Sequence, residues 1–219
     1  MDDSFAAELR GFGPRGLLAI LAILAGALFF GPLAALFVVW WAWRSHTPWR
    51  ELGFRRPKSW TRTLIVAILL GVAFKLVLKA LVMPLLGAPA LNPRYQYLAG
   101  NPLALPFAFY ALILGAGFGE ETFFRGYLFE RLGKLLGTGT SARAATIVIT
   151  TALFALGHLS DQGVAGAEQA TMTGLAFGIA YSATENLVPI IVAHAAFDLT
   201  ALALIYWRLE AAVAHAVFR

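Results

Sequence analysis

The sequence predicts an all-α protein, a polytopic membrane bundle of about 6–8 helices. Three observations lead to this fold class. Of the 219 residues, 59% are hydrophobic and only 13% are charged, whereas soluble domains carry about 25% charged residues. The mean hydropathy is +0.73. The apolar residues form sustained runs of the length that crosses a bilayer, about 20 residues. The chain length suits one domain of about six or seven such spans.

The composition also excludes several classes of function. The chain contains no cysteine, so disulfides, thiolate chemistry and metal bound through sulfur are excluded. The formal net charge is +5, which by itself suggests a nucleic-acid partner. The basic residues, however, lie mostly in the connections between apolar stretches, where orientation in the membrane accounts for them. We therefore expect membrane lipid as the surroundings and no nucleic-acid partner.

The first two apolar stretches are read as one helix each. Residues 17–43 cover about 40 Å at 1.5 Å per residue, enough for one tilted helix and too short for two spans, and Pro32 is expected to kink it. The following connection, residues 44–62, is rich in arginine and lysine, and the positive-inside rule places it in the cytoplasm. Residues 63–86 form the second span. Its Lys75 and Lys79 lie four apart on one face, where we expect them to snorkel or to face the bundle.

Residues 103–137 allow two interpretations. Either a span ends at Gly119 and a surface amphipathic helix follows, or one long, glycine-bent helix carries Glu120 and Glu121 partway along. The first interpretation puts Glu120 and His158 on opposite sides of the membrane. We choose the long helix because it leaves no isolated buried charge.

Three further apolar stretches complete the chain. Residues 142–159 end at His158, residues 170–183 are small and glycine-containing, which suits close helix packing, and residues 187–207 carry His194 and Asp198. The chain is expected to be one structural domain overall, in three segments. These are N-terminal membrane helices with a cytoplasmic loop (1–102), a catalytic core (103–207) and a C-terminal tail (208–219).

The ionisable residues of the core are expected to meet at one site. Each such residue inside a span costs about 2.5–3.5 kcal/mol, so isolated examples are rare. Glu121 precedes the connection near Gly139 by about as many residues as His158 follows it, so two helical arms bring them to similar depth. His194 and Asp198 are four apart and share one helix face. One helix pair and a third helix therefore present carboxylates and imidazoles to a common cavity.

This set of side chains suits hydrolysis by an activated water. A carboxylate near histidines can hold and deprotonate a water molecule. The other histidine and Asp198 can then steady the oxyanion that forms when the water attacks a carbonyl. Arg125 follows Glu121 by four residues and can pair with it. The hypothesis is that Glu120 reacts while Glu121 and Arg125 build the frame.

The sequence does not decide whether the protein binds a metal ion. Neither the HExxH zinc signature nor a Gly-x-Ser-x-Gly elbow occurs. Glu120, His158 and His194 nevertheless form a nitrogen and oxygen ligand set suited to zinc. The sequence leaves open whether a metal or a carboxylate activates the water.

Three motifs carry a family resemblance. They are "EETFFR" (Glu120 to Arg125), "FALGH" (Phe154 to His158) and "HAAFD" (His194 to Asp198), which match EExxxR, FxxxH and HxxxN/D in the expected order. In these motifs the chain resembles the CPBP family of intramembrane proteases, also called the Abi or CAAX-protease family, which includes the Ras-converting CAAX endopeptidase. The resemblance covers about residues 103–207.

The resemblance implies an intramembrane endopeptidase whose cavity opens to the cytoplasmic side. Glu120 and His158 would activate the water, and His194 with Asp198 would form the oxyanion site. The substrate would be a membrane-associated peptide or a lipidated protein, including a prenylated CAAX type. The family has been described both as metalloproteases and as glutamate proteases, which leaves zinc open. We expect an integral protein of the cytoplasmic membrane of a prokaryote. In the CAAX endopeptidases the last motif position is asparagine, so Asp198 weakens the case for a CAAX substrate.

Two rival classes remain at this stage. A proton- or ion-coupled membrane carrier also uses chains of glutamate and histidine, although the sequence shows no inverted repeat of the kind common in carriers. A non-catalytic membrane scaffold would keep the motifs for packing. Cleavage, flux and thermal stability of variants at Glu120 distinguish the three classes.

Overall fold

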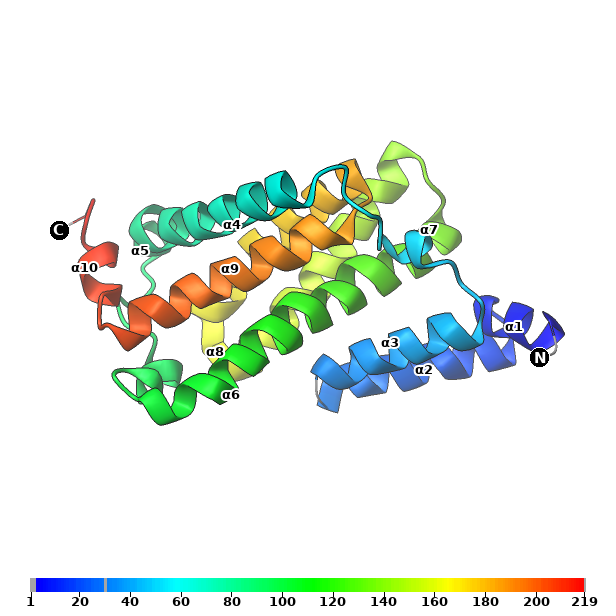
Figure 1. The fold of residues 1–219 in the computed structure, drawn as a ribbon, viewed down its shortest axis with the longest axis horizontal. Helices are drawn as coiled ribbons and strands as arrows, with labels where there is room; N and C mark the ends of the chain where they lie inside the picture. The colour runs from blue at the N-terminus through cyan, green and yellow to red at the C-terminus, as the bar shows by residue number, and fades with distance from the viewer. Residues whose placement is uncertain (1–2, 30, 219) are drawn as a thin grey trace.

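The computed structural model describes residues 3–29 and 31–218, and over these residues it consists of helices and their connections (Figure 1). The all-α prediction is confirmed, with no strand in the described part. The elements, in chain order, are α1 (Asp3–Arg10), α2 (Pro14–Phe29), α3 (Gly31–Arg44), η1 (Trp49–Leu52), α4 (Trp60–Val77), η2 (Leu78–Val82), α5 (Met83–Leu85), η3 (Pro93–Leu98), η4 (Pro102–Ala104), α6 (Leu105–Tyr110), η5 (Ala111–Glu120), η6 (Thr122–Leu128), α7 (Phe129–Leu136), α8 (Thr140–Thr184), α9 (Leu187–Tyr206) and α10 (Glu210–Ala214).

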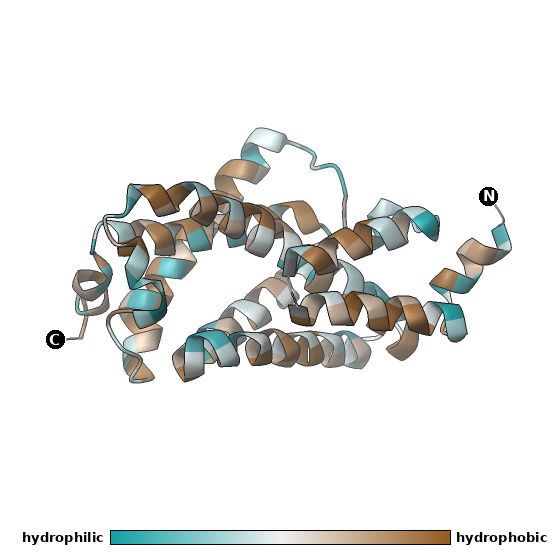
Figure 2. Ribbon diagram, turned by 90° about the horizontal axis from the view of Figure 1, so that it is seen from below, coloured by the Kyte–Doolittle hydropathy of each residue, from teal (hydrophilic) through white to brown (hydrophobic). Residues whose placement is uncertain are grey.

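Four helices of the described chain are long and apolar enough to cross a membrane. They are Trp60–Leu85, Pro102–Leu136, α8 and α9, and the bent pair of α1 and α2 can supply a fifth. This differs from the expected six or seven spans. Apolar turns run along the length of these helices, and hydrophilic residues gather at the connections (Figure 2). That distribution suits helices that stand in lipid.

The expectation of one tilted helix over residues 17–43 is wrong. The stretch forms two short helices, α2 and α3, which fold back on each other (Figure 1). Pro32 is the second residue of α3, where its missing N–H costs nothing, so it starts a new helix instead of kinking a continuous one. Gly26 allows the close approach, because a Cβ there would lie 3.0 Å from the Phe37 ring and 3.5 Å from the Ala34 Cα.

The long-helix interpretation of residues 103–137 is confirmed. Pro102–Leu136 is one continuous helix of 35 residues. Its middle, η5 and η6, has π-helical hydrogen bonding. Such wide turns are rare and frequently mark functional sites. Glu120 ends η5 and Glu121 lies between η5 and η6, so the two carboxylates sit where the backbone departs from a regular α-helix.

Helix α8 folds into an antiparallel hairpin. Gly163 interrupts it with φ 68° and ψ −164°, a conformation that is accessible to glycine. The two arms face each other, because a Cβ on Gly174 would meet Thr151 at 2.9 Å and one on Gly178 would meet Ile147 at 3.3 Å. The two stretches 142–159 and 170–183 therefore form separate arms, as the sequence predicts.

Helices α4 and α9 pack side by side (Figure 1). The contact is close because Gly71 has no side chain, and a Cβ there would lie 2.2 Å from the Ala193 carbonyl oxygen. The division into segments 1–102, 103–207 and 208–219 stays a prediction. Glu210 of the last segment is buried and accepts a hydrogen bond from Gln96 Nε2 at 2.6 Å.

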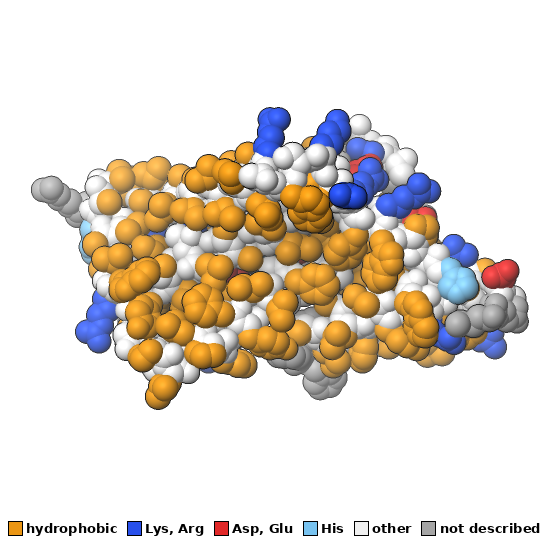
Figure 3. Space-filling model, viewed as in Figure 1, with side chains coloured by type: hydrophobic (Ala, Val, Ile, Leu, Met, Phe, Trp, Pro, Cys, Tyr) orange, Lys and Arg blue, Asp and Glu red, His pale blue; other side chains and the backbone are white. Residues whose placement is uncertain are grey.

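The two ends of the bundle differ in charge. We define the basic end as the end where α3 ends, α4 begins and α7 connects to α8. The N-terminal helices reach the same end, since Arg131 Nη1 donates to the Arg10 carbonyl at 2.9 Å. In Figure 3 the lysine and arginine side chains gather toward this end, on the right, while apolar side chains cover the broad side of the bundle.

Candidate active site

Glu121 is the structural centre of the site. It is completely buried, and its Oε1 accepts hydrogen bonds from Arg125 Nη1 at 2.7 Å and from His194 Nδ1 at 2.6 Å. Arg125 is 1% exposed and also donates from Nη2 to the Gly174 carbonyl at 3.3 Å. Its guanidinium lies 4.9 Å from the ring centroid of Phe154. This network joins the long helix to α8 and α9.

His194 is therefore held by one nitrogen and presents the other to the cavity. Because a carboxylate oxygen can only accept, Nδ1 carries the proton that bonds Glu121. Nε2 lies 3.5 Å from Asp198 Oδ2 and 3.8 Å from Glu120 Oε2. The Phe177 ring packs at 5.3 Å from the imidazole centroid. Three carboxylates thus surround one imidazole ring.

His158 approaches the cavity from the first arm of α8. Its Nδ1 donates to the Phe154 carbonyl oxygen, one turn earlier, at 2.8 Å. The two ring centroids lie 4.5 Å apart, with the ring planes tilted by 54°. Since Nδ1 is used in this bond, a neutral His158 keeps a lone pair on Nε2 and can accept a proton there.

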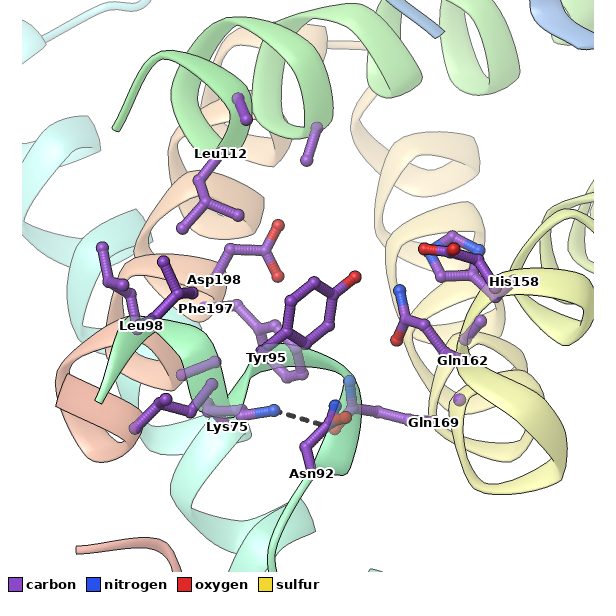
Figure 4. A pocket seen from close by; sticks show the side chains of 18 of the residues that line it. Lys75, Asn92, Tyr95, Leu98, Leu112, His158, Gln162, Gln169, Phe197 and Asp198 are labelled. Atoms are coloured by element: carbon purple, nitrogen blue, oxygen red, sulfur yellow. Dashed lines mark hydrogen bonds between the residues drawn. The ribbon is translucent and has the colours of Figure 1, made fainter. Parts of the chain in front are cut away.

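All four residues predicted to be catalytic line one cavity of about 540 Å³. Glu120, His158, His194 and Asp198 line it, together with residues of α4, η3, α6 and α10. Figure 4 shows Asp198 on α9 and His158 on α8 on different walls. Glu120 Oε2 is buried and has no hydrogen-bond partner among the described protein residues, which leaves it available to a ligand or water in the cavity.

The structure adds cavity residues that the sequence reasoning did not assign to the site. Lys75 faces the bundle interior, and its Nζ donates to Gln169 Oε1 at 2.8 Å (Figure 4). Tyr95 of η3 points its hydroxyl into the cavity (Figure 4). Burial and the neighbouring carboxylates of Asp161 and Asp198 raise the pKa of Tyr95 to about 12. Its hydroxyl therefore remains a hydrogen-bond donor at neutral pH.

Only indirect signals pointed to these residues. The lysine in an apolar span marked a bundle-facing position, and the tyrosine-containing connection NPRYQYLAGNP marked only a polar loop. Nothing in the sequence showed that this loop folds back over the cavity.

The proposed zinc ligands fit a metal only in part. His158 and His194 each donate from Nδ1 to an oxygen and keep Nε2 toward the cavity, an arrangement usual for histidines that bind metals. However, no group of three or more His, Asp or Glu side chains within the described ranges is placed to hold an ion. As arranged, the described side chains do not form a site for a metal ion.

The fold and the site together define a class of protein. It is a helical bundle with spans of lipid-crossing length that encloses carboxylates and imidazoles in a cavity among those spans. Residues 102–200 match the family described as type II CAAX prenyl endopeptidase Rce1-like, so this segment of the chain is similar to that family. The matched segment includes both glutamates, Arg125, both histidines and Asp198. The matched family is one of endopeptidases, which are proteases. Searches among curated proteins and among solved structures found no match.

Proposed function

We propose that the protein is an intramembrane endopeptidase that hydrolyses a peptide bond of a membrane-associated substrate. The observation that carries the proposal is the convergence of Glu120, His158, His194 and Asp198 on one cavity among apolar helices. A cavity of about 540 Å³ lies within the usual range of about 300–1,000 Å³ for ligand sites. It accommodates a short extended segment of chain and excludes a folded domain.

In the proposed reaction, Glu120 is the base. Its Oε2 removes a proton from a water molecule while His158 Nε2 accepts a hydrogen bond from the same water and fixes its direction. The water oxygen bonds to the carbonyl carbon, and the carbonyl π electrons move onto the carbonyl oxygen. The C–N bond then breaks, and the proton held by Glu120 passes to the leaving nitrogen. The products are a carboxylic acid and an amine.

His194 stabilises the oxyanion in this scheme. Nδ1 already donates to Glu121 at 2.6 Å, so a second donation from Nε2 requires the imidazolium form. Three nearby carboxylates favour that positive charge. A donor aimed at developing negative charge lowers the barrier by about 3–4 kcal/mol. Glu121 and Arg125 are positioning residues, because they hold the ring in place and do not line the cavity.

Asp198 completes the site beside His194. It follows His194 by four residues on α9, and its Oδ2 lies 3.5 Å from Nε2. We assign it to orienting the imidazole and balancing its charge. An asparagine, which is the residue of the CAAX endopeptidase motif, would instead donate directly to the oxyanion.

The proposal is tested with purified protein in liposomes and a peptide substrate anchored in the same membrane. Cleavage is followed by mass spectrometry of the products. We expect cleavage by the wild type and by Glu168→Gln, a control at a half-buried carboxylate of α8 that does not line the cavity. His158→Gln is expected to lose most of the activity. Solute flux without any cleavage, abolished by Glu120→Gln, would instead identify a carrier.

A further inference from the structure

We propose that Lys75 is a further positioning residue of the site. Its ammonium group offsets the negative charge that Asp198 places beside the oxyanion, which allows an aspartate to stand at that position. The inference rests on the proposed protease function, because the oxyanion belongs to that reaction. Three features of the structure carry it: the register of α4 and α9, the partners of the two cavity lysines, and the charges around His194.

Lys75 lies at the same depth in the bundle as Asp198. Helices α4 and α9 run in the same direction (Figure 1), and Gly71 lies against the Ala193 carbonyl. Four residues further along each helix, a rise of about 6 Å, come Lys75 and Phe197. Their contact agrees with this register, because Lys75 Nζ lies 4.8 Å from the ring centroid of Phe197. Asp198 follows directly, so the ammonium group and the carboxylate reach the cavity at one level.

Both charged groups face the cavity and not the lipid. Lys75 is 7% exposed and lines the cavity together with Asp198. The two side chains enter it from the adjacent helices α4 and α9, while His158 lies on another wall (Figure 4). Because an ionisable residue inside an apolar span is costly, such residues pair with one another and mark functional sites. The position of Lys75 therefore calls for an opposite charge inside the bundle.

The two lysines of the cavity differ in how their charges are balanced. Lys79 forms an ion pair with the buried Glu210, whose Oε1 lies 3.4 Å from Lys79 Nζ. Lys75 instead donates to a neutral amide oxygen, Gln169 Oε1, at 2.8 Å. This bond fixes the position of the ammonium group without neutralising it. Of the charged side chains around Lys75, Asp198 acts on it most strongly.

The charges around His194 show what this compensation achieves. Three carboxylates lie around the imidazole ring, those of Glu120, Glu121 and Asp198. Arg125 and the imidazolium balance two of them, and Lys75 balances the third, so the site is neutral overall. In the proposed reaction Glu120 loses its charge as the oxyanion gains one, which leaves the total unchanged. Because like charges repel strongly away from water, an uncompensated Asp198 would oppose the oxyanion.

The proposal also accounts for a departure from the motif. The asparagine of the CAAX endopeptidase motif carries no charge and needs no cation beside it. Asp198 brings a carboxylate to 3.5 Å from His194 Nε2, and Lys75 supplies the charge that offsets it. The rival role for Lys75 is direct binding of an anionic group of the substrate. The two roles differ in whether the effect of Lys75 depends on Asp198.

The test is a double-mutant cycle of Lys75→Met and Asp198→Asn in liposomes with an anchored peptide substrate. Methionine keeps the length of the side chain and removes its charge. We expect Lys75→Met alone to lower the cleavage rate, normalised to folded protein, about tenfold. In the Asp198→Asn background the same change should lower the rate less than about threefold. The matched control Lys58→Met, at an exposed lysine outside the cavity, should keep the wild-type rate.

Equilibrium unfolding of the same variants in mixed micelles needs no proteolysis. Lys75→Met should lower the folded-to-unfolded ratio at least about threefold more with Asp198 present than in the Asp198→Asn background. Equal effects in the two backgrounds would overturn the charge compensation. Coupled stability with a cleavage rate that falls equally in both backgrounds would overturn the positioning role and assign Lys75 to the substrate. An absence of cleavage by the wild type would overturn the protease function and the positioning role with it, whereas the unfolding cycle would still decide the charge compensation.

Discussion

The buried pair of Glu121 and Arg125 yields the sharpest prediction of stability. In Arg125→Met a carboxylate that is completely buried loses the cation that lies 2.7 Å away. Removing one partner of a buried ion pair costs about 3–5 kcal/mol, and the remaining bond from His194 Nδ1 at 2.6 Å compensates the Glu121 carboxylate only in part. The carbonyl of Gly174 loses its donor as well. We expect the folded-to-unfolded ratio to fall by roughly two to four orders of magnitude, since about 1.4 kcal/mol is a factor of ten.

The assay is equilibrium unfolding in mixed detergent micelles, followed by circular dichroism. The matched control is Arg55→Met, whose partner Glu185 lies 2.8 Å away but in an exposed pair, with side chains 47% and 51% exposed. Exposed pairs contribute about 0–1 kcal/mol. The double variant Glu121→Gln with Arg125→Met contains no unpaired charge and should recover at least about half of the loss. A cost for Arg125→Met no larger than that of Arg55→Met would refute the reasoning.

Three further predictions concern the site and its packing. His158→Ala should lower the cleavage rate at least about 100-fold, which is the usual contribution of a general acid or base. The unfolding midpoint should stay unchanged, because the His158 side chain bonds only to its own helix. A lower midpoint with normal cleavage would contradict the assignment. Asp198→Asn should keep at least about a tenth of the cleavage rate and Asp198→Leu much less, and equal losses would argue against an orienting role. Gly71→Ala should destabilise the protein, since its Cβ would lie 2.2 Å from the Ala193 carbonyl oxygen. Gly157→Ala should not, because there is open space around Gly157. Coinciding unfolding curves of the two variants would show that α4 and α9 do not pack so closely.

Much of the fold follows from hydropathy and spacing. The ionisable residues of the core fixed the choice of one long helix, because charges inside a membrane must face one another or water. Helical periodicity placed His194 and Asp198 on one face, and their 3.5 Å contact agrees with it. What periodicity does not encode is the π-helical stretch around Glu120, since its sequence is compatible with an ordinary α-helix.

The N-terminal hairpin shows a different limit of sequence reasoning. A run of 27 apolar residues, 17–43, has the same hydropathy whether it forms one tilted helix or two short helices folded together. Pro32 is compatible with both, as a kink in one and as an early helix residue in the other. Tertiary contacts such as that of Gly26 with the Phe37 ring decide between them. The Tyr95 loop depends on tertiary structure in the same way.

Replacement of Glu120 by glutamine tests the central claim most directly. The change keeps the size of the side chain and removes its negative charge together with its capacity to take a proton. The measurement is the initial rate of cleavage of a membrane-anchored peptide in liposomes, normalised to folded protein. If Glu120 activates the water, Glu120→Gln should cleave at a rate at least about 1,000-fold below that of the wild type. Its unfolding midpoint should be unchanged. A variant that cleaves at the wild-type rate would show that Glu120 is not the base.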